Sequence, residues 1–314
     1  MNQLLTAKIY DPQDKAVWDD LTMRSAGGTF LFLRDYMEYH ASRFDDYSLL
    51  FYRKGVPIAI FPANRQGDTV ISHGGLTYGG IVAGPETSTA QILDIFDTLT
   101  AFLRESGIRH LVYKCVPYIY QRYPHAGDLY ALYRAGATRI ACNLSSTIEP
   151  ARQQPYAELR RRGIKKALRT GVTIGESDDY APFWEILSHN LREKFNTAPV
   201  HSLEEITMLH ARFPNQIKLY TATLHNTTVA GTVIYDTGEV AHAQYICASP
   251  EGKQTGALDL LFARLIETTY SGHRYFDFGI STEQNGTYLN TGLLSQKEGF
   301  GARGTLYEIY RVDL

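Results

Sequence analysis

The chain has 314 residues, of which 44% are hydrophobic and 20% are charged, and its formal net charge is −2. These values fit a folded protein that is long enough for two domains of about 150 residues. The small net charge excludes binding to nucleic acid or to an anionic membrane through the overall charge of the chain. The N-terminus has no basic start followed by a long apolar core, and no apolar run reaches the ~18 residues of a membrane helix. We therefore expect a cytoplasmic protein without a signal peptide or a membrane span.

The first elements along the chain are predicted to be helices followed by antiparallel strands. Apolar residues at helical spacing run from Pro12 to His40. Two hairpins are predicted, each from two hydrophobic runs around a two-residue turn: 47–53 and 56–61 around Lys54-Gly55, and 217–224 and 229–235 around His225-Asn226. Each half of the chain is thus expected to start with helices and to continue as an antiparallel meander.

A glycine-rich stretch follows the first hairpin, at residues 71–81, and contains His73 and Tyr78. Several glycines so close together predict a backbone that approaches another group closely. His73 is therefore a candidate for contact with an acceptor substrate. The alternative is that it belongs to a sharp turn.

Part of the chain occurs twice. Residues 85–112 and 250–277 align without a gap, with seven identical pairs, Asp94/Asp259 among them. Both copies predict a turn, an amphipathic helix, a second turn and a hydrophobic strand. A repeat of so long a period predicts two similar domains in tandem, which we place at residues 1–150 and 151–314. Each domain combines helices with a mainly antiparallel mixed sheet, which is a mixed α/β (α+β) class.

A basic segment, Arg152–Arg169, lies between the two halves. It contains seven Arg and Lys residues and one acidic residue, Glu158, and it predicts a helix with a positive face. Two interpretations are open. The segment is either a solvated linker helix or a phosphate-binding edge.

The two copies of the repeat differ at the start of their helices. The second copy has Lys253-Gln254-Thr255-Gly256 where the first has Ser88-Thr89-Ala90-Gln91. This stretch follows a predicted strand, 242–247, and backbone amides from Lys253 to Ala257 at the start of a helix would suit a pyrophosphate. A plain loop before a helix is the alternative. Neither the dinucleotide-binding GxGxxG nor the P-loop pattern occurs.

Two charged residues near the C-terminus are candidates for chemistry. Asp277 stands in an aromatic strand, so its carboxylate needs hydrogen-bond donors or a raised pKa; a general base and a structural aspartate are both open. Lys297 follows the apolar pair Leu293-Leu294, and it either neutralises charge on a reacting carbonyl oxygen or is an exposed lysine. The chain has no GxSxG or HExxH motif and no CxxC pair, so we expect neither a covalent acyl-enzyme nor a metal site.

In the order and spacing of these features, the chain resembles the FemAB-like branch of the GNAT acyltransferase superfamily. The resemblance covers nearly the whole length and is carried by the following segments: Arg160–Ala167 with Gly171-Val172, Ser249–Leu258, Phe276–Gly279, Asn290, and Lys297 with Phe300-Gly301. It implies two fused GNAT-like domains. Only the second would hold the donor, and the first would shape the acceptor site.

The resemblance also implies a reaction: direct transfer of an acyl group to an amine of a small-molecule or cell-envelope precursor. With acyl-CoA as donor, Lys253 takes the basic position and Gly256 the first glycine position of the coenzyme A motif, while Leu258 stands where the motif has Gly or Ala. Aminoacyl-tRNA, the donor of Fem proteins, is the alternative, and nucleic acid would then be a partner, bound along the basic segment. A catalytically silent binding module is a third possibility.

The same resemblance assigns roles to the candidate residues. Two splayed strands, at Tyr245-Ile246 and at Phe276-Asp277, would hold the acyl arm. Asp277 or His73 would take the proton of the amine, and such a base contributes about 10²–10⁴-fold to the rate. Lys297 would stabilise the oxyanion.

Overall fold

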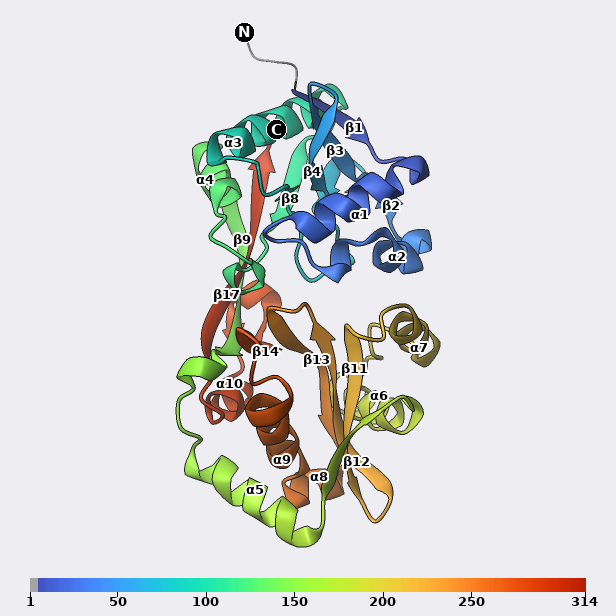
Figure 1. The fold of residues 1–314 in the computed structure, drawn as a ribbon, viewed down its shortest axis with the longest axis vertical. Helices are drawn as coiled ribbons and strands as arrows, with labels where there is room; N and C mark the ends of the chain where they lie inside the picture. Colours follow the sequence, from blue (N-terminus) through green and yellow to red (C-terminus); the bar gives the residue numbers. More distant parts are fainter. Residues whose placement is uncertain (1–4) are drawn as a thin grey trace. The chain divides into compact units, whose positions relative to one another are not determined.

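The computed structural model describes residues 5–314, which form two compact units (Figure 1). Unit 1 comprises residues 5–143, 283–288 and 306–314, and unit 2 comprises Leu144–Thr282 and Leu289–Thr305. The predicted division was contiguous, at residue 150, whereas the strand β17 (Arg303–Asp313) begins in unit 2 and ends in unit 1. It does so because its last residues pair with β8 (His110–Lys114). Within the described part, no helix has both the length and the apolar character needed to cross a bilayer.

Unit 1 contains four α-helices packed on mainly antiparallel strands, with one parallel pair, β6–β8. Its helices are α1 (Lys15–Arg24), α2 (Arg34–Met37), α3 (Thr89–Glu105) and α4 (Gly127–Arg134). Its further strands are β1 (Leu5–Ile9), β2 (Asp45–Asp46), β3 (Leu49–Arg53), β4 (Val56–Phe61), β5 (Asn64–Gln66), β6 (Thr69–Ile71) and β7 (Val82–Ala83). One sheet of this unit has the strand order β1-β3-β4-β7. The remaining strands of the unit pair in the order β17-β8-β6-β5-β2. Ile95 and Leu99 of α3 face Phe51 and Phe61 of the sheet in the main core of this unit.

Unit 2 holds a second mixed sheet with helices on both faces. Its helices are α5 (Glu158–Thr170), α6 (Ala181–Phe195), α7 (Leu203–Arg212), α8 (Pro250–Thr255), α9 (Ala257–Arg264) and α10 (Thr291–Glu298). Its strands are β10 (Thr173–Ser177), β11 (Ile217–Leu224), β12 (Thr227–Asp236), β13 (Val240–Ala248), β14 (Tyr275–Ile280) and the end of β9 (Thr138–Ile148), which starts in unit 1. Two-residue strands β15 (Thr282–Glu283) and β16 (Tyr288–Leu289) pair with each other. The order is β10-β11-β12-β13-β14-β9, and only the β13–β14 pair is parallel.

The faces of this second sheet are covered by different helices, with α9 on one side of β11–β13 and α6 and α7 on the other (Figure 1). On the α9 side, Ala241 and Ala243 of β13 and Phe276 of β14 pack with Phe262 in one hydrophobic cluster. Because side chains alternate along a strand, His242 and Asp277 point to the face opposite α9.

The structure confirms both predicted hairpins. Lys54-Gly55 joins β3 to β4, and His225-Asn226 joins β11 to β12, with positive φ at all four turn residues. The repeat is also present as a helix–strand unit in each half, but its helices differ. In the first half α3 is continuous, whereas in the second Gly256, at a φ of 78°, separates α8 from α9.

Candidate functional site

The two strands predicted to hold an acyl arm are paired only at their beginnings. The parallel pairing of β13 with β14 covers Val240–His242 and Tyr275–Asp277. Past these residues both strands carry a bulge, at Gln244 in β13 and at Phe278-Gly279 in β14, where the register with β12 and β9 shifts. The strands therefore part, and among the described residues no strand pairs with β13 on this side after His242.

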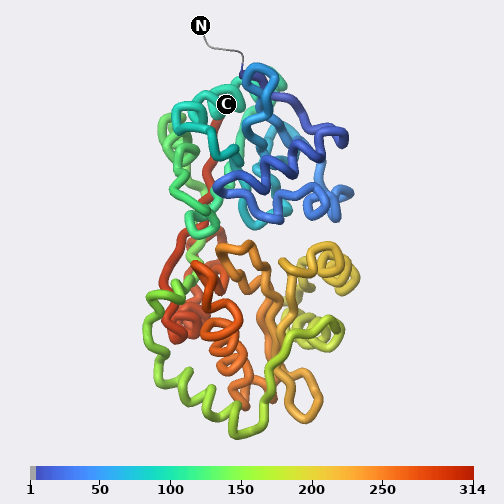
Figure 2. Tube along the Cα trace, in the orientation of Figure 1, coloured from blue at the N-terminus to red at the C-terminus, as the bar shows by residue number. Residues whose placement is uncertain are grey.

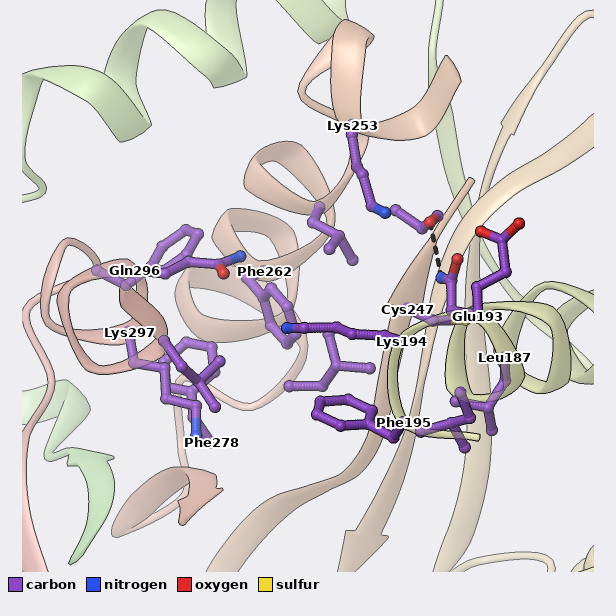
Figure 3. A pocket seen from close by; sticks show the side chains of 17 residues that line it. Leu187, Glu193, Lys194, Phe195, Cys247, Lys253, Phe262, Phe278, Gln296 and Lys297 are labelled. Atoms are coloured by element: carbon purple, nitrogen blue, oxygen red, sulfur yellow. Dashed lines mark hydrogen bonds between the residues drawn. The ribbon is translucent and has the colours of Figure 1, made fainter. Parts of the chain in front are cut away.

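An apolar pocket of about 640 Å³ lies between the parted strands and the helices α6, α9 and α10. Ile246 of β13, Phe278 of β14 and Phe262 of α9 contribute to its wall. Figure 3 shows Lys194 extending from α6 into this pocket toward Phe262, while Lys253 enters from α8. The pocket is therefore lined mainly by hydrophobic side chains, together with the charged side chains of Glu193, Lys194, Lys253 and Lys297.

A second, basic pocket of about 870 Å³ adjoins the apolar one. Lys253, Leu258 and Gln296 line both pockets, so the two pockets adjoin within unit 2, and together we call them the groove. The exposed cations of the basic pocket are Lys253 and, from α5, Arg162 and Lys166. Part of the predicted basic segment thus lies beside the predicted donor residues.

The segment predicted to offer its backbone amides to a phosphate is instead a helix, α8. Ser249 caps this helix and Pro250 is its first residue, a combination that favours a helix start. The amide of Lys253 donates to the Ser249 carbonyl (2.9 Å) and the amide of Gly256 to the carbonyl of Gly252. The expectation that these two amides bind a phosphate is therefore wrong, because both already have carbonyl partners.

The predicted donor residues lie in two different environments. Lys253, Gln254 and Gly256 line the basic pocket. Thr255 and Ala257 are buried; the hydroxyl of Thr255 donates to carbonyls of its own helix, and Ala257 belongs to a hydrophobic cluster. The side chains of Lys253 and Gln254 are thus the groups of this segment that can reach an anion.

The helix α5 packs closely on the start of α9. A Cβ atom at Gly256 would lie 2.6 Å from the carbonyl oxygen of Gly163, and one at Gly163 would overlap the carboxylate of Asp259. Arg160 forms an ion pair with Asp259 beside this contact. Figure 2 shows α5 passing the segment that joins α8 to α9. Two glycines and one ion pair therefore fix the basic helix against the groove.

The strand residues predicted to hold the acyl arm face opposite ways. Ile246 lines the apolar pocket. Tyr245 lies with its hydroxyl 2.5 Å from a ring nitrogen of His201, and its ring contacts Trp184 of α6 edge-to-face. Tyr245 is therefore on the α6 side of the sheet.

Asp277 is fully buried at the point where β13 and β14 part. One carboxylate oxygen accepts hydrogen bonds from the hydroxyls of Ser145 (2.5 Å) and Thr147 (3.1 Å). The other lies 2.8 Å from Nδ1 of His242, whose side chain is 12% exposed. The prediction that Asp277 must find donors is confirmed, but with no exposed surface it cannot itself contact an acceptor. Sequence reasoning missed His242, because only the strand register places it beside Asp277.

Lys297 is buried in the wall of the apolar pocket and is not an exposed lysine. Its amino group donates to the carbonyl oxygens of Gly279 and Ile280, each at 2.8 Å. Burial lowers the pKa of Lys297 to about 8, and the charge of Asp277 partly opposes this shift. The ammonium thus holds the bulged end of β14 in place next to the pocket.

His73 belongs to unit 1, whereas Asp277 and Lys297 belong to unit 2. It occupies a sharp turn at a φ of 54°, its amide donates to Ile71, and its buried ring packs against His40 and Phe44. Burial lowers the pKa of His73 to about 3, so the ring is neutral at physiological pH. These features match the interpretation of His73 as a turn residue.

Comparison with known proteins identifies the fold. Residues 158–287 match the family model described as an acetyltransferase (GNAT) domain. The solved structure of FemX is similar over 98% of this chain and 97% of that one, with a TM-score of 0.68 and 10% identity. This chain has a FemAB-like tandem GNAT fold.

Two further solved structures share this tandem GNAT fold. One is the C-terminal domain of a protein described as a lysylphosphatidylglycerol synthetase from Agrobacterium fabrum, with a TM-score of 0.63, 14% identity and coverage of 96% of this chain and 92% of that one. The other is L-PGS from Bacillus licheniformis, with a TM-score of 0.60, 13% identity and coverage of 96% and 91%. No curated protein matches the chain.

These similarities confirm, at the level of the fold, the resemblance predicted from the sequence and its fold class, two fused GNAT-like domains of mixed α/β structure. The matched GNAT segment contains α5, the α8–α9 junction and the parted strands β13 and β14. Most of the groove therefore lies in an acyltransferase-type domain. Lys297 and the rest of α10 lie outside the matched residues.

Proposed function

We propose that this GNAT protein transfers an acyl group to an amine, and that the acyl donor lies along the groove of unit 2. The observation that carries the proposal is that the apolar pocket and the basic pocket adjoin and share Lys253, Leu258 and Gln296 in their walls. An activated acyl donor with a phosphate-bearing carrier combines the same two properties. Its acyl arm suits the apolar pocket, and its phosphates suit the cations.

The parted strands supply polar contacts for the arm of the donor. Where β13 has no strand beside it, its backbone amides and carbonyls can pair with amide groups of a ligand as they would with an added strand. The hydrophobic side chains around them, among them Ile246 and Phe278, exclude water from the acyl group. The amine would be a group of a small molecule or a cell-envelope precursor.

The phosphates of the donor would be held by side chains more than by a loop of amides. Arg162, Lys166 and Lys253 are exposed around the basic pocket, and each can form a charge-assisted hydrogen bond with a phosphate oxygen. Acyl-CoA is the first donor to test, because the matched GNAT domain is described as an acetyltransferase.

Aminoacyl-tRNA is the second donor to test, because the basic face of α5 extends beyond the pocket. Arg161, Lys165 and Arg169 are exposed on α5 and do not line the groove. Such a ridge suits a long phosphate backbone. In addition, the name of one structural neighbour denotes a protein that makes an aminoacylated lipid, lysylphosphatidylglycerol.

Titration calorimetry with coenzyme A, acetyl-CoA and an aminoacyl-tRNA separates these donors. Lys166→Ala should weaken coenzyme A binding about five-fold, whereas Lys165→Ala, on the same helix but outside the pocket, should leave it unchanged. Both substitutions should weaken tRNA binding, and raising the salt from about 50 to about 200 mM should weaken it by orders of magnitude. Absence of binding by all three probes would refute the proposed acyl transfer.

A further inference from the structure

We propose that His242 is the general base of this site and that Asp277 is its positioning residue. The inference rests on the proposed acyl transfer and names the group that takes the proton of the amine. It assigns to His242 a role that neither the sequence pattern nor the matched family description contains.

The hydrogen bonds around the ring fix its tautomer. Ser145 and Thr147 donate their hydroxyls to one oxygen of Asp277, so the other oxygen is left to accept from Nδ1 of His242. A proton on Nδ1 leaves Nε2 of the neutral ring as an acceptor. Nε2 has no hydrogen-bond partner among the described residues, and the side chain retains 12% exposure.

The position of the ring is suited to an acyl carbonyl held between the strands. His242 and Asp277 form the last paired position of β13 and β14, at the apex of the opening. Gly279, whose carbonyl binds Lys297, adjoins the ring: a Cβ atom on Gly279 would lie 3.4 Å from Cε1 of His242. The base and the buried ammonium thus lie on the two sides of one bulge.

The ring lies on the face of the sheet opposite the basic pocket. The basic pocket lies beside α9, whereas His242 points to the other face, on which α6 and α7 pack. A donor that enters from the α9 side and passes between the strands would present its carbonyl to an amine that approaches from the His242 side. Donor and acceptor then meet at the apex.

The three catalytic residues predicted from the sequence cannot act in this way. Asp277 has no exposed surface, and both of its oxygens have partners. The amino group of Lys297 is bound to two carbonyls. His73 is buried in unit 1.

The proposed step conserves atoms and electrons. The amine nitrogen attacks the carbonyl carbon of the acyl thioester or ester, and Nε2 of His242 accepts the proton that the nitrogen loses. As the tetrahedral intermediate collapses, the bond from carbon to sulfur or oxygen breaks, and the ring returns the proton to the leaving thiolate or alkoxide. The products are an amide and a free thiol or alcohol.

The tautomer can be measured without any substrate. Proton–nitrogen NMR of protein labelled with nitrogen-15 histidine should show His242 of the wild type with its proton on Nδ1. In Asp277→Asn, Ser145 and Thr147 should hold the new amide oxygen, which turns the NH2 group to Nδ1 and moves the ring proton to Nε2. A wild-type ring protonated on Nε2 would overturn the inference, whether or not the Asn variant folds.

The catalytic role is tested with acetyl-CoA as donor and n-butylamine as acceptor. His242→Gln should lower kcat by about 10²–10⁴-fold while the Kd of acetyl-CoA changes by less than about two-fold. The loss should shrink with hydroxylamine, an amine that is unprotonated at neutral pH. His273→Gln is the matched control, since His273 pairs with Asp236 at 2.9 Å in the same unit but lines neither the apolar pocket nor the basic pocket.

The outcomes separate this inference from the proposed function. An unchanged kcat in His242→Gln, or equal losses in His242→Gln and His273→Gln, would overturn the role of His242. A wild type that transfers no acyl group with any donor would refute the proposed function instead. The wild-type NMR measurement then still decides whether His242 presents a basic Nε2.

Discussion

Replacing Gly256 by alanine tests the close packing of α5 against the start of α9. Gly256 has a φ of 78°, and an added Cβ would lie 2.6 Å from the carbonyl oxygen of Gly163, a backbone atom that cannot rotate away. Gly171→Ala is the matched control. Gly171 also follows a helix in the left-handed conformation, at a φ of 84°, but an added Cβ there meets nothing within 4 Å.

The difference between the two variants isolates the steric contact. An alanine in the left-handed region costs about 1–2 kcal/mol at either position. Overpacking against α5 adds about 1–3 kcal/mol at Gly256 alone. Gly256→Ala should therefore lower the free energy of unfolding by about 2–5 kcal/mol and Gly171→Ala by about 1–2 kcal/mol.

Urea denaturation followed by tryptophan fluorescence measures this difference. The chain has two tryptophans, Trp18 in unit 1 and Trp184 in unit 2, so a Trp18→Phe background makes the signal report unit 2. Equal losses of stability in Gly256→Ala and Gly171→Ala would refute the reasoning, because they would show that α5 does not press on this junction.

Two further substitutions test buried charges in the same unit. Lys297→Met removes a group whose pKa falls from 10.5 to about 8 on folding. Between these pH values the folded chain binds fewer protons than the unfolded chain, so raising the pH favours the folded wild type. The free energy of unfolding of the wild type should therefore rise relative to that of the variant by about 3 kcal/mol from pH 8 to pH 10.5. Urea midpoints of the wild type and the variant at about pH 7.5 and about pH 10 measure this change, and the control Lys165→Met should behave like the wild type. A difference between Lys297→Met and the wild type that does not change with pH would contradict the assignment. Arg160→Met leaves the buried Asp259 unpaired and should lower the free energy of unfolding, measured in urea, by about 3–5 kcal/mol. Arg161→Met, which removes an exposed ion pair, should lower it by less than about 1 kcal/mol. Equal losses in the two variants would contradict the assignment.

The local elements of this protein could be predicted because their determinants are local. Lys54-Gly55 specifies a turn between two hydrophobic runs, and the structure has β3 and β4 around it. The apolar spacing of residues 92–103 likewise specified α3, which Ser88 caps. Periodicity and turn chemistry act over a few residues, so one sequence is sufficient to recognise them.

The start of the second repeat was harder to predict, although its determinants are also local. Ser249 stands where the first copy has Gly84, and its hydroxyl caps a helix that the first copy cannot start at that point. The second helix therefore begins a turn earlier, and the amides of Lys253 and Gly256, predicted to bind a phosphate, donate to carbonyls of this helix turn instead. Ser249-Pro250 is itself a signal for a helix start, so the sequence does contain the information that places the start of α8.

The His242–Asp277 pair could not be predicted from the sequence, because it depends on strand register. The two residues are 35 positions apart, on strands whose parallel pairing requires a crossover through α8 and α9. Sequence reasoning chose Asp277 from its aromatic surroundings, and it had no means of choosing His242 over the other histidines. Long-range pairing of this kind is the information that only the three-dimensional structure contains.

The return of β17 to unit 1 has a consequence for how the chain is synthesised and dissected. Residues 309–313 complete the pairing of β8, so this edge of β8 has no partner strand until residues 309–313 have been synthesised. A fragment that ends at residue 150 would leave this edge of β8 open to pairing with other molecules, which favours aggregation. Because the sequence of each unit is interrupted by segments of the other, neither unit could be exchanged by recombination as one contiguous segment.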